Sequence, residues 1–434
     1  MFGERGRSQA HPAPGDRDAL LGRRRLVQLG AAAVTGAAAA AAAGPAGRAS
    51  ASESPSALLG VTPGIDVREF GTIRTTDPDF DAFPVLRRAL DEVPEGTTIW
   101  IPPVGPGEAY RLSAELDVDR HVNLAGSWGR DKNDDNGNEV YGSILQPLDR
   151  QTQDGMTSLL RVRRSWVSVD GLALVGHGAR AGSIGLRFAG DGESHHTHGA
   201  LARRVVAVGF AAGVTFGAWS DHATLEHCAL NGNTDGITFE RDNHFDHFVT
   251  GSFLDGNERA SIYLPAGVGT DNFAVIRSHL GFSRFGILHE DPDGENRGFS
   301  GLVLIASPIE FVSEQHVVLA TSGNIRIEGG YWTWDGTPAR PAFTVRDVTH
   351  GPVWLSPRLD EGFPNPESPA LVDVTGYANH PIYVQTPLND FARTVRRGSR
   401  SLPLVAGGRA DGGALTSLIA ALQAAGLIED GTIA

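Results

Sequence analysis

The middle of the chain repeats itself at intervals of 25 or 26 residues, and this repeat constrains the fold more than any other feature. Each copy contains short apolar segments separated by Gly, Asn, Asp or Ser, and none shows the i, i+3, i+4 spacing of an amphipathic helix. A repeat made only of short strands cannot bury its own apolar side, so the copies must stack into a parallel solenoid. Five consecutive copies begin at Ala223, Phe248, Phe273, Phe299 and Ile325.

Residues at equivalent positions of successive copies are predicted to form vertical columns. The clearest are an inward leucine stack, a small-residue column and a pair of turn asparagines: Leu230, Leu254 and Leu280; Cys228, Ser252 and Ser278; Asn233 and Asn257. Cys228 is the only cysteine, which excludes an internal disulfide framework and a cysteine-based zinc cluster. Its place in a column predicts a small core residue and not a nucleophile.

The first fifty residues have the order of an export signal. Arg23–Arg25 precede an alanine-rich apolar run over Leu29–Ala43, and Ala49–Ala51 supply the small residues of a signal peptidase site. This order predicts a twin-arginine signal over residues 1–51 and a secreted mature protein. The alternative is a basic patch followed by a disordered alanine tract.

The charge balance disfavours anionic partners. The chain has 37 Lys and Arg against 51 Asp and Glu, a formal net charge of −14. Removing residues 1–51 leaves an even more acidic protein, because that segment holds seven Arg and three acidic residues. Such a protein repels a phosphate backbone, which excludes nucleic acid as an expected partner. Polyanionic sugars are also repelled on average, unless a local arginine patch overrides the field.

The amino-terminal part of the mature chain resembles the cap of the pectate lyase superfamily. The resemblance rests on Val67–Gly71, an acidic turn at Asp77–Asp79, a helical pattern over Ala82–Asp91, Thr98–Pro103 and Tyr110–Leu112. Members of that superfamily are all-β, right-handed, single-stranded parallel β-helices, and an amphipathic helix there covers the open end of the solenoid. The resemblance implies this fold for roughly residues 65 to 380. It does not imply one reaction, because the fold serves lyases, hydrolases, epimerases and phage tailspikes.

These patterns divide the chain into four parts. Residues 1–51 are the signal, 52–111 the amino-terminal cap, 112–385 the parallel β-helix, and 386–434 a tail. The tail has helical spacing over Ala414–Gly426, which predicts a short terminal helix. No other apolar run is long enough to span a bilayer, so we expect no membrane contact of the mature form.

One strand of each copy is the candidate substrate face, because enzymes of the family that this chain resembles bind substrate along one strand column. If Ile237 and Phe239 point inward, alternation along the strand places Thr238 and Glu240 outward. The same alternation predicts three further outward residues: Thr215, Tyr263 and Leu288. Outward residues two coils apart lie ~10 Å apart, which suits two carboxylates acting across a glycosidic bond.

Carboxylates and histidines concentrate in this strand and the loop after it, which predicts an acid–base cluster on one flank of the solenoid. The candidate acid–base groups are Asp235, Glu240, His289 and Glu290, with Asp235 and Glu240 considered as a pair. The candidate substrate contacts are Arg259, Arg284, Tyr263 and Trp219. The alternative is a set of solvated loops that keeps the protein soluble.

The segment Asn233–Ile237 resembles the N-T-D-G motif of polygalacturonase-type hydrolases, in which the aspartate is catalytic. The two partner motifs of that family are absent at the equivalent positions, where Arg259 and Arg284 stand, and Asp255 and His279 fall in other columns. The two arginines therefore either bind a substrate carboxylate, serve as a lyase base, or pair with neighbouring carboxylates on the surface.

Metal-binding patterns are weak, and we predict no metal or cofactor. The alternative is calcium, at Asp131–Glu139 or at the acidic residues of Asp291–Glu295, although neither spacing matches a calcium loop. The histidine-rich segment His195–His198 is interpreted as a flexible polar insertion between coils.

The sequence thus favours a secreted enzyme that degrades polysaccharide, either a lyase or a glycoside hydrolase, with a polysaccharide as its partner. The alternative is a solenoid without catalysis that binds carbohydrate or serves as a tailspike-like structural protein. The sugar, the bond cleaved and the oligomeric state have no signature in the sequence.

Overall fold

A computed structural model describes most of the chain that follows the predicted export signal. The described residues are 64–130, 140–179, 182–192, 195–240, 244–290, 298–335, 340–348, 351–359, 371–376, 380–384, 394–397 and 400–403. The export signal, the terminal helix over 414–426 and the two acidic loops at 131–139 and 291–295 lie outside them. Residues from Thr62 onward form one compact unit, and only this unit is described below.

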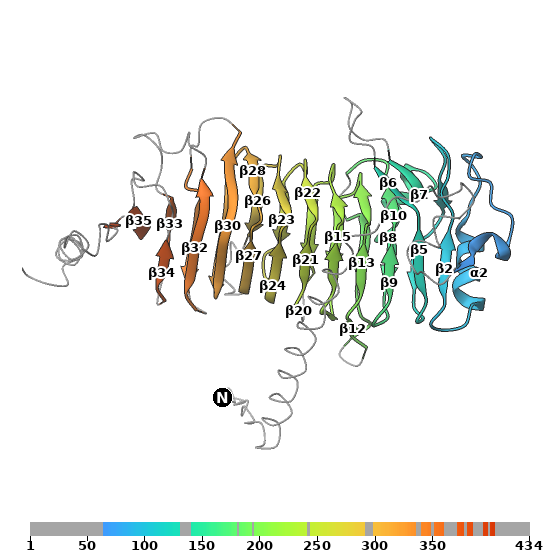
Figure 1. The fold of residues 1–434 in the computed structure, drawn as a ribbon, viewed down its shortest axis with the longest axis horizontal. Coiled ribbons are helices and arrows are strands. Elements are labelled where there is room, and N and C mark those ends of the chain that lie inside the picture. Colours follow the sequence, from blue (N-terminus) through green and yellow to red (C-terminus); the bar gives the residue numbers. More distant parts are fainter. Residues whose placement is uncertain are drawn as a thin grey trace, which may run out of the picture. The chain divides into compact units, whose positions relative to one another are not determined.

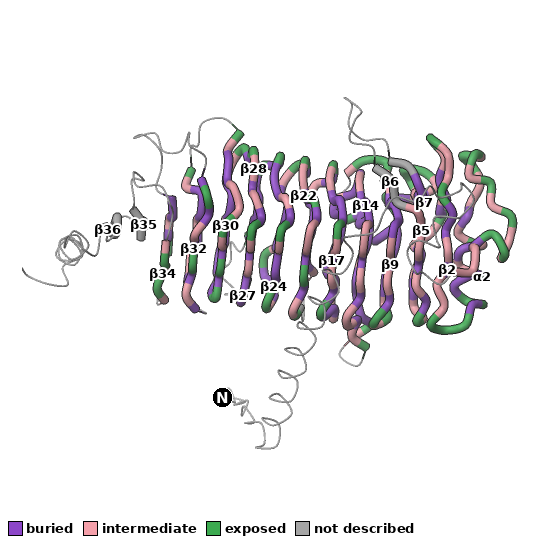
Figure 2. Tube along the Cα trace, in the orientation of Figure 1, coloured by how far each residue is buried: buried purple, intermediate pink, exposed green. Residues whose placement is uncertain are grey.

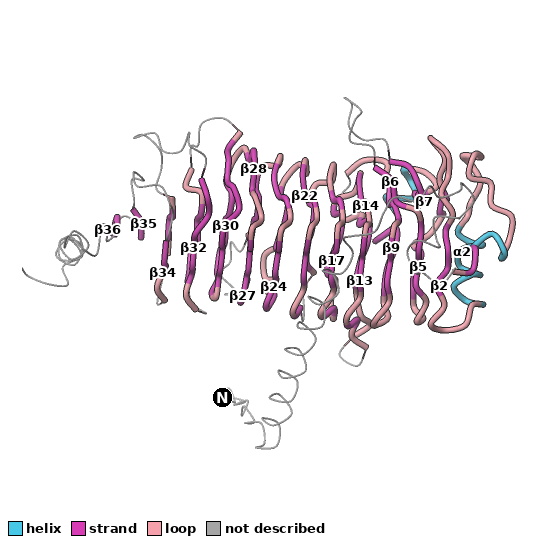
Figure 3. The backbone as a smooth tube through the Cα atoms, viewed as in Figure 1, coloured by secondary structure: helices cyan, strands magenta, loops and turns pink. Residues whose placement is uncertain are grey.

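The unit is an all-β parallel β-helix, which confirms the predicted fold class (Figures 1 and 3). Each coil contributes strands to three columns, and each strand pairs in parallel with the equivalent strand of the next coil. The first column contains β1 (Ile65–Asp66), β2 (Thr98–Ile101), β5 (Asn123–Gly126), β9 (Ser168–Asp170), β13 (Leu201–Arg203), β17 (Thr224–Glu226), β21 (Phe248–Thr250), β24 (Thr270–Ile276), β27 (Phe299–Ile305), β30 (Ile325–Trp334), β32 (Val353–Leu359) and β34 (Ile382–Val384).

From β9 onward the second column follows the first after one residue or a few, and longer segments separate β2 from β3 and β5 from β7. It contains β3 (Tyr110–Leu112), β7 (Val140–Pro147), β10 (Leu172–Val175), β14 (Val206–Val208), β18 (Ala229–Leu230), β22 (Phe253–Asp255), β25 (His279–Gly281), β28 (Ile309–Val312) and the end of β30.

The third column contains the strands that the sequence predicts as the substrate face. They are β4 (Leu116–Val118), β8 (Ser158–Val162), β11 (Ile184–Phe188), β15 (Ala212–Phe216), β19 (Asp235–Phe239), β23 (Ala260–Leu264), β26 (Phe285–His289), β29 (Gln315–Gly323), β31 (Phe343–Val348), β33 (Val372–Val374) and β35 (Thr394–Arg397).

A few elements lie outside these columns. Three short strands follow the third column: β12 (Thr197–His198), β16 (Ser220–Asp221) and β20 (His244–Phe245). Two antiparallel pairings involve β6 (Trp128–Arg130) and β36 (Arg400–Pro403). The helical segments are the 3₁₀ turn η2 (Val67–Phe70), α2 (Phe83–Glu92) and α3 (Arg150–Gly155).

The helix predicted over Ala82–Asp91 is confirmed as α2, at the end of the stack beside β2 (Figure 1). Pro84 lies in its first turn, where a missing backbone N–H has no cost. Leu86, Ala89 and Leu90 are buried and belong to the same apolar cluster as the first coils. The helix therefore covers apolar side chains that an open solenoid end would expose. Within the described part of the chain, no helix combines the length and the apolar composition needed to cross a bilayer.

Inward side chains and polar ladders hold the coils in register, and Figure 2 shows buried residues recurring along the strands from coil to coil. Leu254 pairs with Leu280 across the ladder and both are fully buried, as is Leu230. The backbone N–H of Cys228 donates to Ser252 Oγ at 3.0 Å, and Ser252 N–H donates to Ser278 Oγ at 3.1 Å. Burial raises the pKa of Cys228 to about 12, so the thiol stays protonated and unreactive at neutral pH.

The turn between the first and second columns is made by a single left-handed residue in coil after coil. The residues are Gly171, Arg204, His227, Gly251, Arg277, Ala306 and Gly329, with φ between 49° and 67°. One residue in this conformation bends the chain sharply without a loop. Non-glycine residues tolerate it here because the ladders on both sides fix the backbone.

The asparagine ladder gives the first test of the stacked register. Asn257 is buried, its Nδ2 donates to Leu230 O at 3.0 Å, and its Oδ1 accepts from Asn233 N–H at 3.2 Å. Asn257→Ala leaves both backbone groups unsatisfied, so we expect the free energy of unfolding to fall by roughly 2–4 kcal/mol in urea titrations followed by circular dichroism. The exposed neighbour supplies the control, since Glu258→Ala should change stability by no more than about 0.5 kcal/mol. Equal effects of the two substitutions would contradict the ladder.

Candidate functional site

The outward side of the third column has the composition expected from strand alternation, but it is more covered than predicted. Ladder pairing places Thr215, Thr238, Tyr263 and Leu288 at one register position in successive coils, preceded by Arg187. Thr238 and Tyr263 are partly exposed. Thr215 and Leu288 are buried, contrary to expectation, because they are covered by neighbours on the same face.

Both covered residues have identifiable neighbours. The hydroxyl of Thr215 lies 2.8 Å from that of Thr238, and Leu288 packs against Ala260 and Phe285 in a small apolar cluster outside the main core. The accessible part of the face is therefore centred on Thr238 and Tyr263.

Four of the predicted site residues come together around Tyr263. Arg259 forms a bidentate ion pair with Asp235, with Nε–Oδ1 and Nη2–Oδ2 distances of 2.9 and 2.5 Å. The Arg259 guanidinium carbon lies 3.5 Å from the centre of the Tyr263 ring. The Tyr263 hydroxyl donates to Glu290 Oε2 at 3.0 Å. We call Asp235, Arg259, Tyr263 and Glu290 the tyrosine cluster.

The two carboxyl groups of this cluster have opposite environments. Asp235 is only 2% exposed, whereas Glu290 faces solvent. Burial raises the pKa of Asp235 above its usual value, the paired Arg259 opposes that shift, and the Glu290 carboxylate adds to it. Burial also raises the pKa of Tyr263, which keeps its hydroxyl a hydrogen-bond donor at neutral pH.

Glu240 lies apart from this cluster and is not paired with Asp235. It follows the last residue of β19 and forms a bidentate ion pair with Arg187, at 2.8 and 2.6 Å. Asp235 begins the same strand, and five residues at ~3.3 Å each separate the two backbones by ~16 Å. The two carboxylates are held by different arginines, Asp235 by Arg259 and Glu240 by Arg187, so they do not form the expected pair in this structure.

His289 is a core residue and does not face the groove. It is 2% exposed, its Nδ1 accepts the Ala320 N–H at 3.3 Å, and its ring meets Phe299 edge-on. The alternation that sets Leu288 outward also sets His289 inward. The prediction of His289 as an accessible acid–base group is therefore wrong, and the alternation along the strand already places its side chain inward.

The remaining predicted contacts border the face without joining the tyrosine cluster. Arg284 follows Arg259 in the turn that precedes the third column, as predicted, and pairs with Glu314. It lines a depression of about 400 Å³ together with Phe282 and Phe311. Trp219 lies in the loop after β15, in the left-handed conformation with φ of 60°.

A charged triad that the sequence analysis did not assign lies on the second column. His279 donates to Asp255 Oδ1 and Glu310 Oε2, each at 2.6 Å. Burial opposes the charge on His279, but the hydrogen bonds to the two carboxylates outweigh it and raise its pKa to about 9. Exposed phenylalanines surround the triad: Phe253, Phe282 and Phe311. Only the coil register reveals this group, because its members lie 24 and 31 residues apart.

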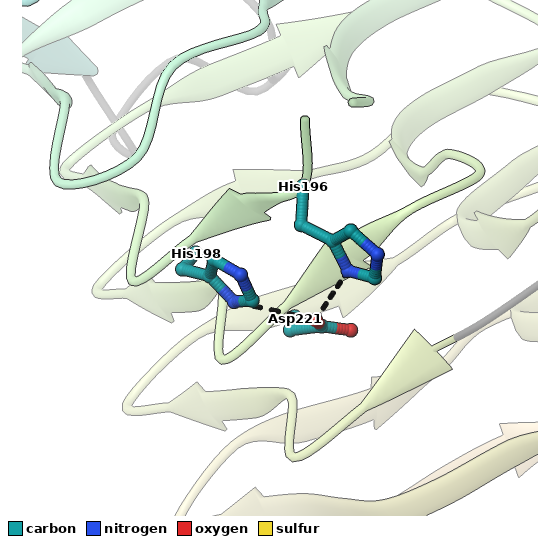
Figure 4. Close-up of side chains that lie close together, drawn as sticks. All are labelled: His196, His198 and Asp221. Carbon is teal, nitrogen blue, oxygen red and sulfur yellow. Dashed lines mark hydrogen bonds and ion pairs between the residues drawn. The ribbon is translucent and has the colours of Figure 1, made fainter. Parts of the chain in front are cut away.

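Part of the histidine-rich segment, interpreted from the sequence as a flexible polar insertion, forms a paired strand. Thr197 and His198 form β12, which pairs in parallel with β16. This pairing brings His196 and His198 onto Asp221, with Nδ1–Oδ2 distances of 2.8 and 3.2 Å (Figure 4). These three are the only His, Cys, Asp or Glu side chains in the described ranges that converge like metal ligands. Trp219 contacts the His196 ring edge-on, with ring centres 5.1 Å apart.

Sequence comparisons assign no family. No family profile matches the chain, and no characterised protein shows significant sequence similarity to it. Solved structures give distant likenesses. They include DFA-IIIase from Arthrobacter chlorophenolicus A6 without its lid (15% identity, TM-score 0.44, 77% of this chain and 92% of that chain). Another is the Dettilon tailspike protein (10% identity, TM-score 0.43, 74% of this chain and 68% of that chain). A third is the catalytic unit of a GH87 α-1,3-glucanase from Streptomyces thermodiastaticus strain HF3-3 (12% identity, TM-score 0.39, 78% of this chain and 71% of that chain). At these TM-scores the likenesses support no assignment of activity.

The charged triad predicts a specific dependence of stability on pH. A histidine whose pKa is raised by folding stabilises the native state fully below its unfolded pKa of about 6.5, and this stabilisation is lost as pH rises through about 9. We therefore expect wild type to exceed His279→Gln by roughly 1–2 kcal/mol in unfolding free energy at pH 6, with the difference shrinking toward pH 10. A difference that stays constant from pH 6 to pH 10 would show that the charge on His279 has no part in stability.

Proposed function

We propose that this chain is an enzyme that hydrolyses a polysaccharide along the outward face of the third column, with the tyrosine cluster as its centre. The observation that carries the proposal is the contrast between two carboxyl groups in one cluster. Asp235 is buried with a raised pKa, and Glu290 is exposed and hydrogen-bonded to Tyr263. Two carboxyl groups in different environments are the usual requirement for acid–base hydrolysis of a glycosidic bond.

The charges on this face favour a neutral sugar chain over a uronate. Three arginines in the described part of this face already pair with the protein: Arg187 with Glu240, Arg259 with Asp235, and Arg284 with Glu314. Glu290 adds a negative charge beside Arg259. A uronate chain would meet no uncompensated cation in this cluster, so hydrolysis is a better fit than the elimination catalysed by lyases.

The geometry suggests a role for each member of the cluster. Glu290 is the accessible carboxylate and serves as base or nucleophile, while the Tyr263 hydroxyl orients it. Burial raises the pKa of Asp235, so when the sugar binds and Arg259 shifts toward it, Asp235 takes up a proton from solvent and then donates that proton to the leaving-group oxygen. The Tyr263 ring, partly exposed, offers a surface for a sugar ring.

A solenoid that binds carbohydrate without cleaving it is the second candidate. It is favoured by the exposed phenylalanines beside the charged triad, which form an aromatic surface in which the ring centres of Phe282 and Phe311 lie 4.9 Å apart. In this case a glycan would bind at Phe253, Phe282 and Phe311 and the tyrosine cluster would be structural.

Substitution within the cluster separates these candidates. Glu290→Gln should lower the rate of reducing-end release from a neutral polysaccharide by about 10²–10⁴-fold, because it removes a general acid–base group. Glu226→Gln makes the same chemical change on the first column and should leave the rate unchanged. Assays on pectate and alginate, followed by the ultraviolet absorbance of an unsaturated uronate, should show no product. Absorbance on those substrates would show that the reaction is the elimination of a lyase and not hydrolysis. Full activity of Glu290→Gln would show that the tyrosine cluster takes no part in catalysis.

We also propose that the protein is exported by the twin-arginine route, on the strength of the order of charge, apolar run and cleavage residues over 1–51. Arg24→Gln interrupts both adjacent arginine pairs and should keep most of the protein in the cytoplasm, as measured by fractionation and immunoblotting. Arg17→Gln, outside the arginine run, is the control and should not affect export. Equal export of both variants would contradict this route.

A further inference from the structure

We propose that His196, His198 and Asp221 bind one divalent transition-metal ion of the zinc type. The proposal is independent of the polysaccharide function, and it departs from the sequence-based expectation that no metal binds. It begins from the backbone, because β12 and β16 pair in parallel and hold His198 beside Asp221 in register. His196 adjoins β12, so all three donors lie on two adjacent, ordered segments.

The donor atoms have a spacing that a metal ion can bridge. Nδ1 of His196 and Nδ1 of His198 lie 2.8 and 3.2 Å from the same carboxylate oxygen, Asp221 Oδ2, and all three donors fall within 4.8 Å of one another. Zinc–ligand bonds of ~2.0–2.2 Å in a tetrahedron place neighbouring ligand atoms ~3.3 Å apart. The two nitrogen–oxygen distances lie within about half an ångström of this value, and Figure 4 shows both imidazoles turned toward the Asp221 carboxylate.

The burial of Asp221 gives a second and independent reason for a cation. The residue is 5% exposed, and its Oδ1 has no hydrogen-bond partner among the described residues. An ionised carboxylate with one unsatisfied buried oxygen is costly unless a positive charge compensates it. The two imidazoles satisfy only Oδ2, so hydrogen bonding alone leaves this cost in place.

The donor set selects the type of metal. Two imidazole nitrogens and one carboxylate suit zinc, cobalt and nickel, whereas calcium and magnesium prefer oxygen ligands. Three protein ligands leave the fourth position of a zinc ion to water or another ligand, as in catalytic zinc sites. The His198 side chain is 45% exposed, so solvent reaches the site from its side.

A bound ion would fasten the loop before β12 to the next coil. Gly190 already approaches the backbone of Trp219 closely, and the Gly190 N–H donates to Ala218 O at 3.0 Å. A metal joining His196 to Asp221 would add a link between the same two segments. Thermal stability should therefore rise when zinc is added to metal-free protein.

Calorimetric titration of the full mature protein tests the proposal after removal of metals with a chelator. We expect saturable binding of one zinc ion per chain and no comparable binding of calcium. His198→Gln and Asp221→Asn should each weaken zinc binding by at least ~100-fold, since loss even of outer-shell partners costs 10–100-fold. His227→Gln, an exposed histidine on another turn, should bind zinc like wild type.

A spectroscopic measurement keeps the test independent of folding defects. Cobalt bound by two histidines and one aspartate should give a visible absorption band that zinc displaces, and the band should be absent from His198→Gln. His198 is the most exposed ligand, so this variant should keep the circular dichroism spectrum of wild type. Absence of saturable zinc binding, or zinc binding that His198→Gln and Asp221→Asn leave intact, would overturn the proposal.

Discussion

The hydrogen bonding of each coil to the next is the interaction on which the rest of the structure depends. Every strand inside the three columns uses its backbone groups to pair in parallel with the coil before and after it, and the terminal strands pair with one neighbouring coil, so no coil is stable alone. The polar ladders formed by Ser252, Ser278, Asn233 and Asn257 join each turn to the turn of the next coil in the same way. Because the register does not slip between Ala212 and Leu288, residues about 25 positions apart become neighbours, and every cluster described above is a consequence.

The same stacking explains why charges on the outer surface occur in pairs. A side chain that points outward from one coil lies ~4.8 Å from its equivalent in the next, so like charges repel and opposite charges pair across coils. Arg259 with Asp235 is a pairing of this kind, whereas Arg187 reaches Glu240 from two coils away. The pairing neutralises the arginines described on the candidate face, and this neutralisation is the basis for proposing a neutral glycan over a polyanion.

The repeating parts of the molecule could be predicted from the sequence, and the non-repeating parts could not. The repeat interval and the alternation of Ile237, Thr238 and Phe239 predict the coil, the inward columns and the burial of Cys228, because these depend only on period and polarity. The same alternation places His289 in the core, so its position along the strand, and not its residue type, decides that it is inaccessible. The pairing of Glu240 with Arg187 depends on how the loops after β19 turn, and no periodic rule describes those loops. The contact between His196 and Asp221 depends on β12, a strand of two residues that has no sequence signal of its own.

The location of a bound glycan tests the central claim most directly, because the claim assigns function to one face of the solenoid. A crystal structure of the Glu290→Gln variant soaked with fragments of a neutral polysaccharide that the wild type cleaves would show that location. The account predicts a sugar ring on Tyr263, with the chain running along the third column past Thr238. A glycan bound only over Phe253, Phe282 and Phe311, with the tyrosine cluster empty, would contradict it.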